Sequence, residues 1–470
     1  MKMLFNGEWV DLPEKRVIRN PQDGSEIDTV PLAGADVMKS AIDYAVEGFE
    51  RSRKMPTHQR ISILQKAADL IQERHEEFSQ TLAKEGIKTI SEARKEVTRC
   101  IETIRISAEE SRRIVGKTIP FDQMPGSENR FGYYIRMPIG IIGAITPFND
   151  PLNLVAHKVG PAIASGNAII VKPHSHTPLS ALLLAEVIHE AGIPPAILQV
   201  ITGRGSIIGD VLVTDPRVRM ISFTGGRGTG EDIMKRVGLK KIGMELGSNS
   251  PVIVMDDCDM KLAVESSVSG AFWAAGQNCL HAQRIIIHDS IYDEFSKLFI
   301  AATKAYKVGD KLDESTDMGP IVNDEEATRV ENMVKEAIDK GATLLTGGKR
   351  KGTFYDPTVL ENIPDTCSLA SDEVYGPVCT FHRFKTLDEA IDIANSVDFG
   401  LQSAIFTNDL KTAIYASHEL QCGGVMVNDS TDYRIDAMPF GGIKGSGLGR
   451  EGIEFAVHEM TEPKVVCFNL

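Results

Sequence analysis

The early part of the chain has the pattern of amphipathic helices. Over residues 57–111, charged side chains alternate with apolar ones at helical spacing. A helix with one apolar face buries that face against another element. We therefore expect a layer of helices here, with an apolar face that includes Ile61, Leu64, Ala68 and Ile71.

Short apolar runs follow, separated by segments with helical spacing. This alternation predicts parallel strands joined by helices, because parallel neighbours need a crossover connection. One of the helices has signals at both ends, since Thr177 can cap it, Pro178 suits its first turn and Gly192 can close it. The runs cover residues 139–145, 168–171, 197–201, 220–223 and 252–255.

A second α/β pattern begins after Gly276. Apolar runs at 284–288, 404–406 and 425–427 predict strands, and the amphipathic stretch 290–306 predicts a long helix. These elements indicate a second domain.

Two segments do not fit either domain. Residues 120–138 combine turn residues with the alternating segment 130–136, which indicates a hairpin or an edge extension. The last stretch, 461–468, is expected to form a strand that pairs with this hairpin or with another subunit.

Length and charge narrow the possible classes of protein. A chain of 470 residues exceeds the roughly 250 to 300 that one hydrophobic core supports, so we expect two or three domains. A formal net charge of -14 argues against a surface that neutralises nucleic-acid phosphates. The N-terminus lacks a signal-peptide core, and no apolar run approaches the ~20 residues of a membrane span. We expect a cytoplasmic protein with neither nucleic acid nor membrane as a partner.

The cysteines indicate no metal site and no disulfide framework. The seven form an odd set without a CxxC pair. Cys279 and His281 are close in sequence, but no second group of metal ligands accompanies them. We therefore expect no metal.

A glycine-rich turn links the run at 220–223 to a helix. Gly225, Gly226 and Gly230 would let the backbone approach a pyrophosphate at the start of that helix. Glycine turns after strands are common, so the turn alone is a weak signal. A second turn, 203–209, misses the G-x-G-x-x-G spacing and is interpreted as structural.

Three polar residues are candidates for catalysis, each with a simpler alternative. Glu245 lies in a glycine-flanked turn before an apolar run and is a mobile carboxylate or an ordinary loop glutamate. Asn149 follows a strand and is an oxyanion donor or a turn residue. Cys279, in the segment AAGQNCLHAQR, is a nucleophile or a small buried thiol.

Taken together, these segments resemble the aldehyde dehydrogenase superfamily over nearly the whole chain. Any one of the motifs could arise by chance, whereas seven in the family's order identify the family. They are PFND with Asn149, VKP with Lys172, FTGG with Gly225, MELG with Glu245, GQNC with Cys279, DEVYGPV with Glu373 and PFGGIKGSGLGREG at 439–452.

The resemblance implies an α/β fold with a Rossmann-type cofactor domain, a second α/β catalytic domain and a small β extension for oligomerisation. Residues 1–119 and 139–248 would form the NAD(P)-binding domain and 249–438 the catalytic domain. Residues 120–138 and 453–470 would assemble a homodimer or homotetramer.

The resemblance also implies a catalytic mechanism. Cys279 would be the nucleophile, Asn149 and the Cys279 backbone N–H would form the oxyanion hole, and Glu245 would be the general base. Aldehyde oxidation would pass through a thiohemiacetal and a thioester that water hydrolyses. Members that transfer the acyl group to coenzyme A commonly lack a carboxylate at the position of Glu245, so hydrolysis is favoured over acylation of coenzyme A.

The resemblance identifies a set of cofactor contacts. Family members that prefer NAD often carry glutamate three residues after the lysine of the KP motif, and Ser175 stands there in this chain. A serine does not repel a 2'-phosphate and Lys172 adds positive charge, so NADP is expected to be preferred over NAD. The expected contacts are Phe148, Lys172, Ser175, Gly225, Gly226, Gly230, Leu246 and Glu373.

The substrate is expected to be a small polar or anionic aldehyde. By resemblance the pocket would include Arg105, Asn153, His157, His281 and Arg434, and the two arginines could bind an anionic group or make structural ion pairs. Two alternatives remain open, a non-catalytic protein that keeps the fold and a Rossmann oxidoreductase without a covalent step.

Overall fold

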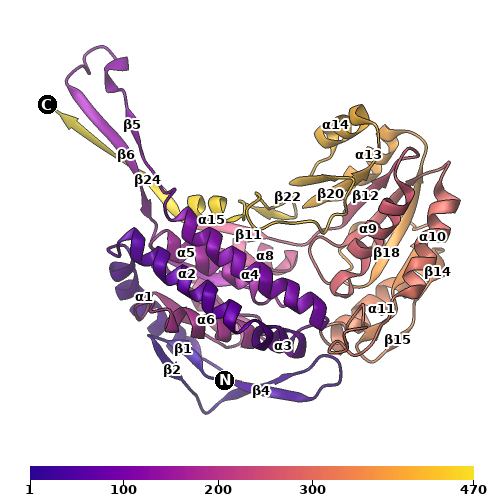
Figure 1. Ribbon diagram of the computed structural model, residues 1–470, viewed down its shortest axis with the longest axis horizontal. Coiled ribbons are helices and arrows are strands. Elements are labelled where there is room, and N and C mark those ends of the chain that lie inside the picture. The colour runs from indigo at the N-terminus through magenta and orange to yellow at the C-terminus, as the bar shows by residue number, and fades with distance from the viewer.

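The computed structural model describes all residues 1–470, and it contains two α/β bodies and a three-stranded sheet that projects from them (Figure 1). Each large body has a mostly parallel sheet at its centre and helices on both faces. The helices α2 (Thr57–Glu73), α3 (His75–Glu85) and α4 (Ile90–Glu110) form the predicted helical layer. No helix is long and apolar enough to cross a membrane.

The first sheet has eight strands, and its central neighbours run parallel. Its edges are antiparallel, where β1 pairs with β2 and β9, and β11 pairs with β23. In spatial order the strands are β2 (Glu8–Val10), β1 (Met3–Phe5), β9 (Leu198–Val200), β8 (Ala168–Lys172), β7 (Ile141–Ile145), β10 (Val218–Thr224), β11 (Lys241–Glu245) and β23 (Gly447–Leu448).

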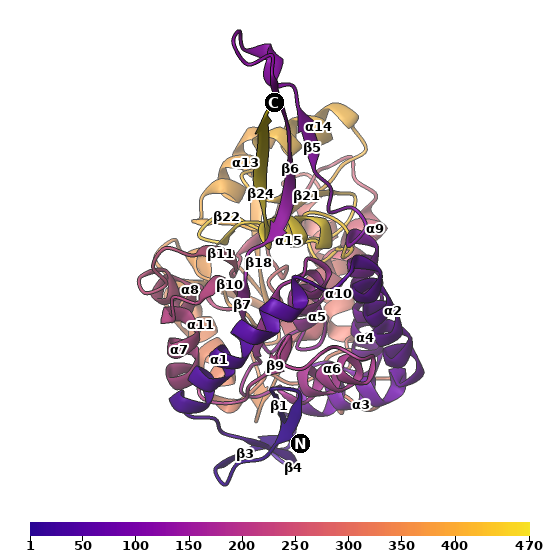
Figure 2. The ribbon, with the colours of Figure 1, turned by 90° about the vertical axis from the view of Figure 1, so that its left-hand side faces the viewer.

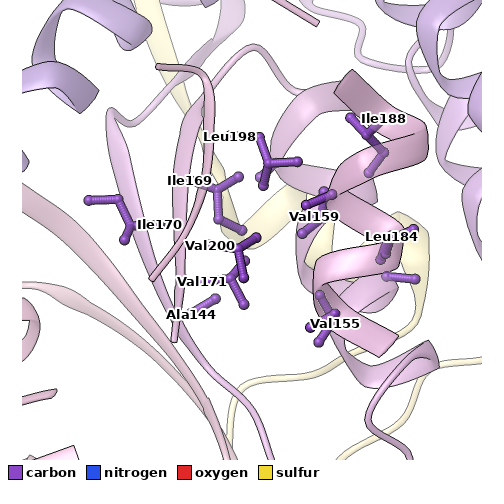
Figure 3. Packing of buried hydrophobic residues seen from close by; sticks show 14 of the residues in the cluster. Ala144, Val155, Val159, Ile169, Ile170, Val171, Leu184, Ile188, Leu198 and Val200 are labelled. Carbon is purple, nitrogen blue, oxygen red and sulfur yellow. The ribbon is translucent and has the colours of Figure 1, made fainter. Parts of the chain in front are cut away.

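Alternate side chains of this sheet fill two layers of core. Figure 3 shows Ile169 and Val171 pointing toward the helices that carry Val159 and Leu184, while Ile170 points to the opposite face. Such alternation follows from the two-residue period of a strand. The covering helices are α5 (Asn153–Ala164) and α6 (Leu179–Glu190) on one face, with α1 (Ala35–Ser52), α7 (Asp210–Thr214) and α8 (Arg227–Met234) elsewhere around the sheet (Figure 2).

The second sheet begins earlier in the chain than Gly276. The strand at Ser250–Val254 lies at its centre, between parallel neighbours. Val252 and Val254 pack toward one set of helices and Ile253 toward another. The strand order is β14 (Thr343–Thr346), β17 (Thr358–Glu361), β18 (Val378–Phe384), β13 (Ala282–His288), β12 (Ser250–Val254), β20 (Gln402–Phe406) and β21 (Gly424–Val427).

Helices cover both faces of the second sheet, as the sequence pattern predicts. The stretch expected to be a long helix forms α10 (Tyr292–Ala305). The other helices of this domain are α9 (Met260–Phe272), α11 (Asp324–Asp339), α12 (Ser368–Ser371), α13 (Leu387–Asn395) and α14 (Leu410–Glu419). Two short antiparallel strand pairs accompany them, β15 (Arg350–Lys351) with β16 (Phe354–Tyr355) and β19 (Phe399–Gly400) with β22 (Ile443–Lys444).

The small sheet projects from the first body. The terminal strand β24 (Thr461–Asn469) pairs antiparallel along the whole of β6 (Arg130–Pro138), and β5 (Lys117–Ile119) pairs with the other edge of β6. Figure 1 shows this sheet projecting away from both domains. The prediction that the terminal strand pairs with the hairpin is confirmed within one chain.

Two details differ from the sequence expectations. Helix α6 is not capped by Thr177, because the Glu85 carboxylate of α3 accepts the N–H groups of Leu179 and Ser180 instead, at 2.7 and 2.8 Å. Helix α15 (Ile453–Glu459), expected among the oligomerisation elements, packs on α5, and Val457 joins the core of the first domain. Only β24 of that segment belongs to the small sheet.

Candidate active site

A cavity of about 1040 Å³ lies where the two domains meet. The carboxyl ends of the parallel strands β7, β8, β10 and β11 open onto it, as expected for a ligand site of a doubly wound sheet. Lining residues at or just after these strand ends include Asn149, Lys172, Gly225 and Glu245. Cys279, carried by the second domain, lines the same cavity.

The start of helix α8 faces this cavity with free backbone donors. Gly226 stands before its first residue and no side chain caps the helix. A Cβ on Gly225 would lie 2.7 Å from the Phe223 ring, so the close turn requires glycine there. Gly230 was expected to contact the cofactor, but it lies inside α8 and packs against Leu246. A Cβ added at Gly230 would be 2.7 Å from Leu246 Cδ2.

The glycine turn at 203–209 also belongs to the cavity, although the sequence indicated a structural role. Gly205, Ser206 and Gly209 line it. Residues 205–209 form one turn of π-helix that continues into α7. The strict G-x-G-x-x-G spacing was therefore the wrong criterion for this turn.

The expected cofactor contacts other than Gly230 all line the cavity, and aromatic residues form part of its wall. The Phe148 ring lies 5.8 Å from the Tyr375 ring in a T-shaped arrangement and 5.2 Å from His174. Glu373 accepts the N–H of Ser248 at 2.8 Å. The lining set includes Phe148, Lys172, Ser175, Gly225, Gly226, Leu246 and Glu373.

A dinucleotide fits this cavity in size and in chemistry. The volume lies just above the usual range for ligand pockets, about 300 to 1,000 Å³, as a ligand as long as a dinucleotide requires. The uncapped start of α8 suits a pyrophosphate. Lys172 supplies positive charge, and the only hydrogen bond of its ammonium group goes to the Pro173 carbonyl at 3.0 Å.

A left-handed turn leads from α9 to Cys279. Ala274, Ala275 and Gly276 have φ values of 52°, 53° and 66°, a region that side chains with a Cβ rarely adopt. Such strain persists where the surroundings fix it. The Ala274 N–H donates to the buried Glu92 carboxylate at 2.8 Å, and a Cβ on Gly276 would be 2.1 Å from the Gly376 carbonyl oxygen. Helix α4 of the first domain thus holds the loop of the second.

The Cys279 thiol reaches the cavity from an apolar setting. Leu280, Leu401 and Phe440 form a small buried cluster against it. Burial raises the pKa of Cys279 to about 12, although the Arg434 charge opposes this shift. The thiol is therefore protonated at neutral pH in this structure.

Glu245 lies at the end of strand β11, not in a turn as expected. Its side chain is buried, and Oε2 has no hydrogen-bond partner. Burial, reinforced by the nearby Glu451 charge, raises the pKa of Glu245 well above its usual range. A free oxygen and a raised pKa are what a general base near neutral pH needs.

Glu451 and Lys158 form a buried ion pair behind Glu245. The Lys158 ammonium donates to Glu451 at 2.8 Å and also to Ser222 and Thr224 at 3.0 and 2.8 Å. Although burial opposes ionisation, the Lys158 charge and other cations hold the pKa of Glu451 down to about 2. Sequence reasoning missed this pair, but a lysine inside the apolar helix α5 was a signal of a buried charge.

Asp436 connects a second group of buried polar residues. It accepts hydrogen bonds from Asn153 at 3.1 Å and His157 at 2.8 Å, and it pairs with Arg99 at 2.8 Å. Burial raises the pKa of Asp436, but the His157 and Arg99 contacts outweigh it and the pKa falls far below its usual range. Asn153 and His157, expected near the substrate, are thus brought together by two residues that the sequence did not indicate.

Arg434 and His281 each keep an unused polar atom. The Arg434 guanidinium carbon lies 3.7 Å from the centre of the Phe440 ring and one nitrogen is 3.4 Å from Glu451, while Nε has no partner. His281 is buried, its Nε2 is unpartnered, and burial lowers its pKa to about 4.

Arg105 does not join these residues. It lies half exposed on α4, where it pairs with Glu102 at 3.1 Å and Asp69 at 3.7 Å and donates to Gln72 at 2.5 Å. Arg105 therefore makes structural ion pairs, which was the alternative to its binding an anionic group of the substrate. Arg99, six residues earlier on the same helix, faces Asp436 instead.

Comparison with known proteins agrees with this geometry. The family model described as "Aldehyde dehydrogenase family" matches residues 9–466. The chain is 49% identical to aspartate-semialdehyde dehydrogenase 1 of Pseudomonas canavaninivorans, over 96% of each chain.

Two solved structures resemble the whole chain. Aldehyde dehydrogenase 21 from Physcomitrella patens, in complex with the reaction product succinate, has a TM-score of 0.97 at 39% identity and covers 99% of this chain and 98% of its own. The glyceraldehyde-3-phosphate dehydrogenase GapN from Methanocaldococcus jannaschii, complexed with NADP, has a TM-score of 0.94 at 41% identity and covers 98% of this chain and 100% of its own. The chain belongs to the aldehyde dehydrogenase family and is an NAD(P)-dependent oxidoreductase.

Proposed function

We propose that the enzyme oxidises a small anionic aldehyde to the free carboxylic acid through a thioester on Cys279. The observation that carries this proposal is the single cavity shared by Cys279, Asn149 and Glu245, with Lys172 and the start of α8 along the same cavity. A bound NAD(P) would supply the hydride acceptor.

The three catalytic residues would act in sequence. The Cys279 sulfur adds to the aldehyde carbon once its proton has left, and the Asn149 amide with the Cys279 N–H stabilises the oxyanion that forms. Asn149 suits this role because no protein group bonds its buried side chain, which leaves the amide free to donate. After hydride departs, the carbonyl of the thioester is attacked by water that Glu245 deprotonates.

The Glu245 carboxylate favours hydrolysis over transfer to coenzyme A. Its unpartnered Oε2 is available to accept a proton from water. Steady turnover without coenzyme A is the expected result. An absolute requirement for coenzyme A would contradict the hydrolytic step and leave the thioester chemistry standing.

NADP is the proposed preferred cofactor. Ser175 lines the cavity beside Lys172, and neither residue repels a 2'-phosphate. The GapN relative was solved with NADP, which agrees with this preference. Comparison of kcat/KM for the two cofactors tests it, and a strong preference for NAD would refute it.

An anionic substrate is supported by Arg434 and Arg99. Arg434 is buried and keeps a free Nε, and Arg99 is partly exposed beside Asp436. Of the three relatives described above, one is named for aspartate semialdehyde, one is named for glyceraldehyde 3-phosphate, and one was solved with its reaction product succinate. All three compounds carry acidic groups. The proposed anion site therefore uses Arg99 in place of Arg105.

A panel of short aldehydes with matched neutral and acidic members tests the substrate class. Arg434→Ala should raise KM for the acidic members and leave KM for propionaldehyde unchanged. The control is Arg105→Ala, whose ion pairs lie on the surface of α4. Equal effects of Arg434→Ala on neutral and acidic members would exclude the anion site.

We also propose that the enzyme assembles as a homodimer or homotetramer through the projecting sheet. The strand β24 presents a free edge beyond its pairing with β6, and Val465 and Phe468 are exposed on it. A cytoplasmic location stays a prediction from the sequence.

A further inference from the structure

A hairpin near the N-terminus carries an arginine that no carboxylate neutralises. Strands β3 (Lys15–Arg19) and β4 (Glu26–Pro31) pair antiparallel, with Arg16 opposite Val30. Ile18 is buried in the first core, and side chains two residues apart share a face of a strand, so Arg16 points toward the body of the molecule. Arg16 makes no ion pair and no side-chain hydrogen bond, and it is only partly exposed.

The hairpin lies beside the turn that follows β9. The Ala33 N–H donates to the Thr202 carbonyl at 2.9 Å, and Ala33 and Gly203 form a parallel bridge. The Thr202 hydroxyl in turn donates to the Pro31 carbonyl at 2.6 Å. The end of β4 is thereby fixed to the turn whose next residues, Gly205 and Ser206, line the cavity.

The end of strand β8 brings Lys172 to the same place. Strands β8 and β9 are neighbours in the first sheet, with Val171 opposite Val200. The Lys172 side chain runs along the turn, because a Cβ on Gly205 would be 3.7 Å from its Cε. Arg204, beside Gly205, is largely exposed, and its one ion pair, with Glu14, spans 3.8 Å.

The pKa shifts of these side chains are those expected for cations that lie near one another. Burial and the Arg16 charge lower the pKa of Lys172 to about 8. Burial and the Arg204 charge lower the pKa of Arg16. In a chain with a net charge of -14, these three cations, of which only Arg204 has an ion pair, form a concentration of positive charge. An anion bound there would relieve their mutual repulsion.

We propose that Arg16 is a specificity residue for NADP, contributing with Lys172 and Arg204 to a subsite for the 2'-phosphate of the cofactor. The proposal rests on the NADP preference proposed above and adds a residue from outside the nucleotide-binding strands and turns. A phosphomonoester carries up to two negative charges, and an arginine binds it through paired N–H donors.

Contacts at the turn of the hairpin hold Arg16 in position. Gln22 accepts the N–H of Lys311 at 3.0 Å, and the Pro21 carbonyl accepts the Thr353 hydroxyl at 2.7 Å. Both partners belong to the second domain. Figure 1 shows the strand β4 along the lower edge of the first domain, with the turn directed toward the second. The hairpin is therefore anchored at both ends, which limits the freedom of Arg16.

Equilibrium binding of cofactors and fragments tests the proposal without turnover. Dissociation constants of NADPH, NADH, 2'-AMP and 5'-AMP would be measured for the wild type and for Arg16→Gln by calorimetry. Loss of one charge-assisted contact should raise the dissociation constants of NADPH and 2'-AMP about 10-fold and leave those of NADH and 5'-AMP unchanged. Arg19→Gln is the matched control, because Arg19 lies on the same strand but is exposed and pairs with Glu26.

The outcomes separate the new inference from the cofactor preference. If the wild type binds NADPH more tightly than NADH and Arg16→Gln keeps that difference in full, the role of Arg16 is refuted and the preference stands. If the wild type binds NADH more tightly than NADPH, the proposed preference for NADP is refuted, and the 2'-phosphate subsite is refuted with it. If Arg16→Gln weakens NADH and NADPH equally, the arginine supports the hairpin and does not read the phosphate. Arg16→Lys should restore part of the NADPH affinity.

Discussion

At the scale of single residues, the two central groups both lie in surroundings that disfavour their charged forms. Burial raises the pKa of the Cys279 thiol and of the Glu245 carboxyl. Hydrolysis needs the ionised carboxylate. Deacylation is therefore lost as pH falls through the raised pKa of Glu245, at a higher pH than the value near 4.3 of an ordinary glutamate.

Replacing Glu245 with glutamine separates the two halves of the reaction. The amide cannot accept the proton of water, so a burst of reduced cofactor equal to the enzyme concentration should precede slow turnover. Stopped-flow absorbance of the cofactor measures the burst. Full steady turnover of Glu245→Gln would contradict its role as base.

The oxyanion role of Asn149 predicts a large loss in kcat. Removing such a donor typically lowers kcat ~100 to 1,000-fold, which corresponds to about 2.7 to 4 kcal/mol of transition-state stabilisation. The kcat of Asn149→Ala should be reduced by a factor in that range. Cofactor affinity and melting temperature serve as controls and should stay near the wild-type values. A loss smaller than about 10-fold would remove Asn149 from the oxyanion hole.

The raised pKa of Cys279 predicts slow alkylation at neutral pH. Only the thiolate reacts with iodoacetamide, so the rate for the cofactor-free enzyme should keep increasing between pH 7 and pH 10. Cys279→Ser corrects for the other cysteines, of which Cys467 is exposed. A rate that levels off near pH 8.5, as for an ordinary cysteine, would disprove the shift.

The sequence could predict the candidate catalytic residues but not the network around them. Motifs place Cys279, Glu245 and Asn149 in the family's order, whereas the choice between Arg99 and Arg105 depends on which face of α4 turns inward. Asp436 lies in a segment without a repeating pattern and acquires partners only when α4 and α5 approach it. Long-range contacts of this kind have no local signature.

At the scale of elements, the loop before Cys279 stores backbone strain that other segments hold in place. Two consecutive alanines adopt positive φ, which no sequence pattern indicates, since alanine favours a right-handed helix. The parallel strands were predictable from apolar runs. The cap of α6 was not, because Glu85 reaches it from another helix.

Adding a methyl group at Gly276 should disrupt this loop. Gly276→Ala combines a positive φ with a contact of 2.1 Å to the Gly376 carbonyl, so both stability and activity should fall. Thermal unfolding and kcat measure the two effects. Gly341→Ala is the control, because Gly341 has a φ of 115° but open space around it, so the substitution should cost about 1 to 3 kcal/mol from backbone strain alone and leave activity intact. Equal effects of the two changes would mean that the contact with Gly376 is not important.

At the scale of the whole molecule, the first domain contributes strand ends and the start of α8 to the cavity, and the second contributes Cys279, the proposed nucleophile. The pattern along the chain was enough to predict two α/β domains and the pairing of the last strand with the hairpin. The pattern did not predict that the second sheet starts at Ser250, although the family resemblance places a domain boundary at 249, and neither predicted that α15 joins the first core, which depends on packing between distant segments.

Removing the terminal strand tests the proposed assembly. A chain that ends at Met460 keeps α15 and both cores but lacks β24. Size-exclusion chromatography with light scattering should find a smaller species than the full-length chain, with far-UV circular dichroism close to the original. A full-length chain that is already monomeric would exclude the assembly.

The setting of Cys279 also has a consequence for resistance to oxidation. Peroxide attacks the thiolate, so a half-buried thiol that stays protonated at neutral pH is oxidised slowly. The sulfur becomes reactive only when substrate chemistry removes its proton. We therefore expect the enzyme to keep its activity in peroxide at concentrations that would inactivate an exposed cysteine with a low pKa.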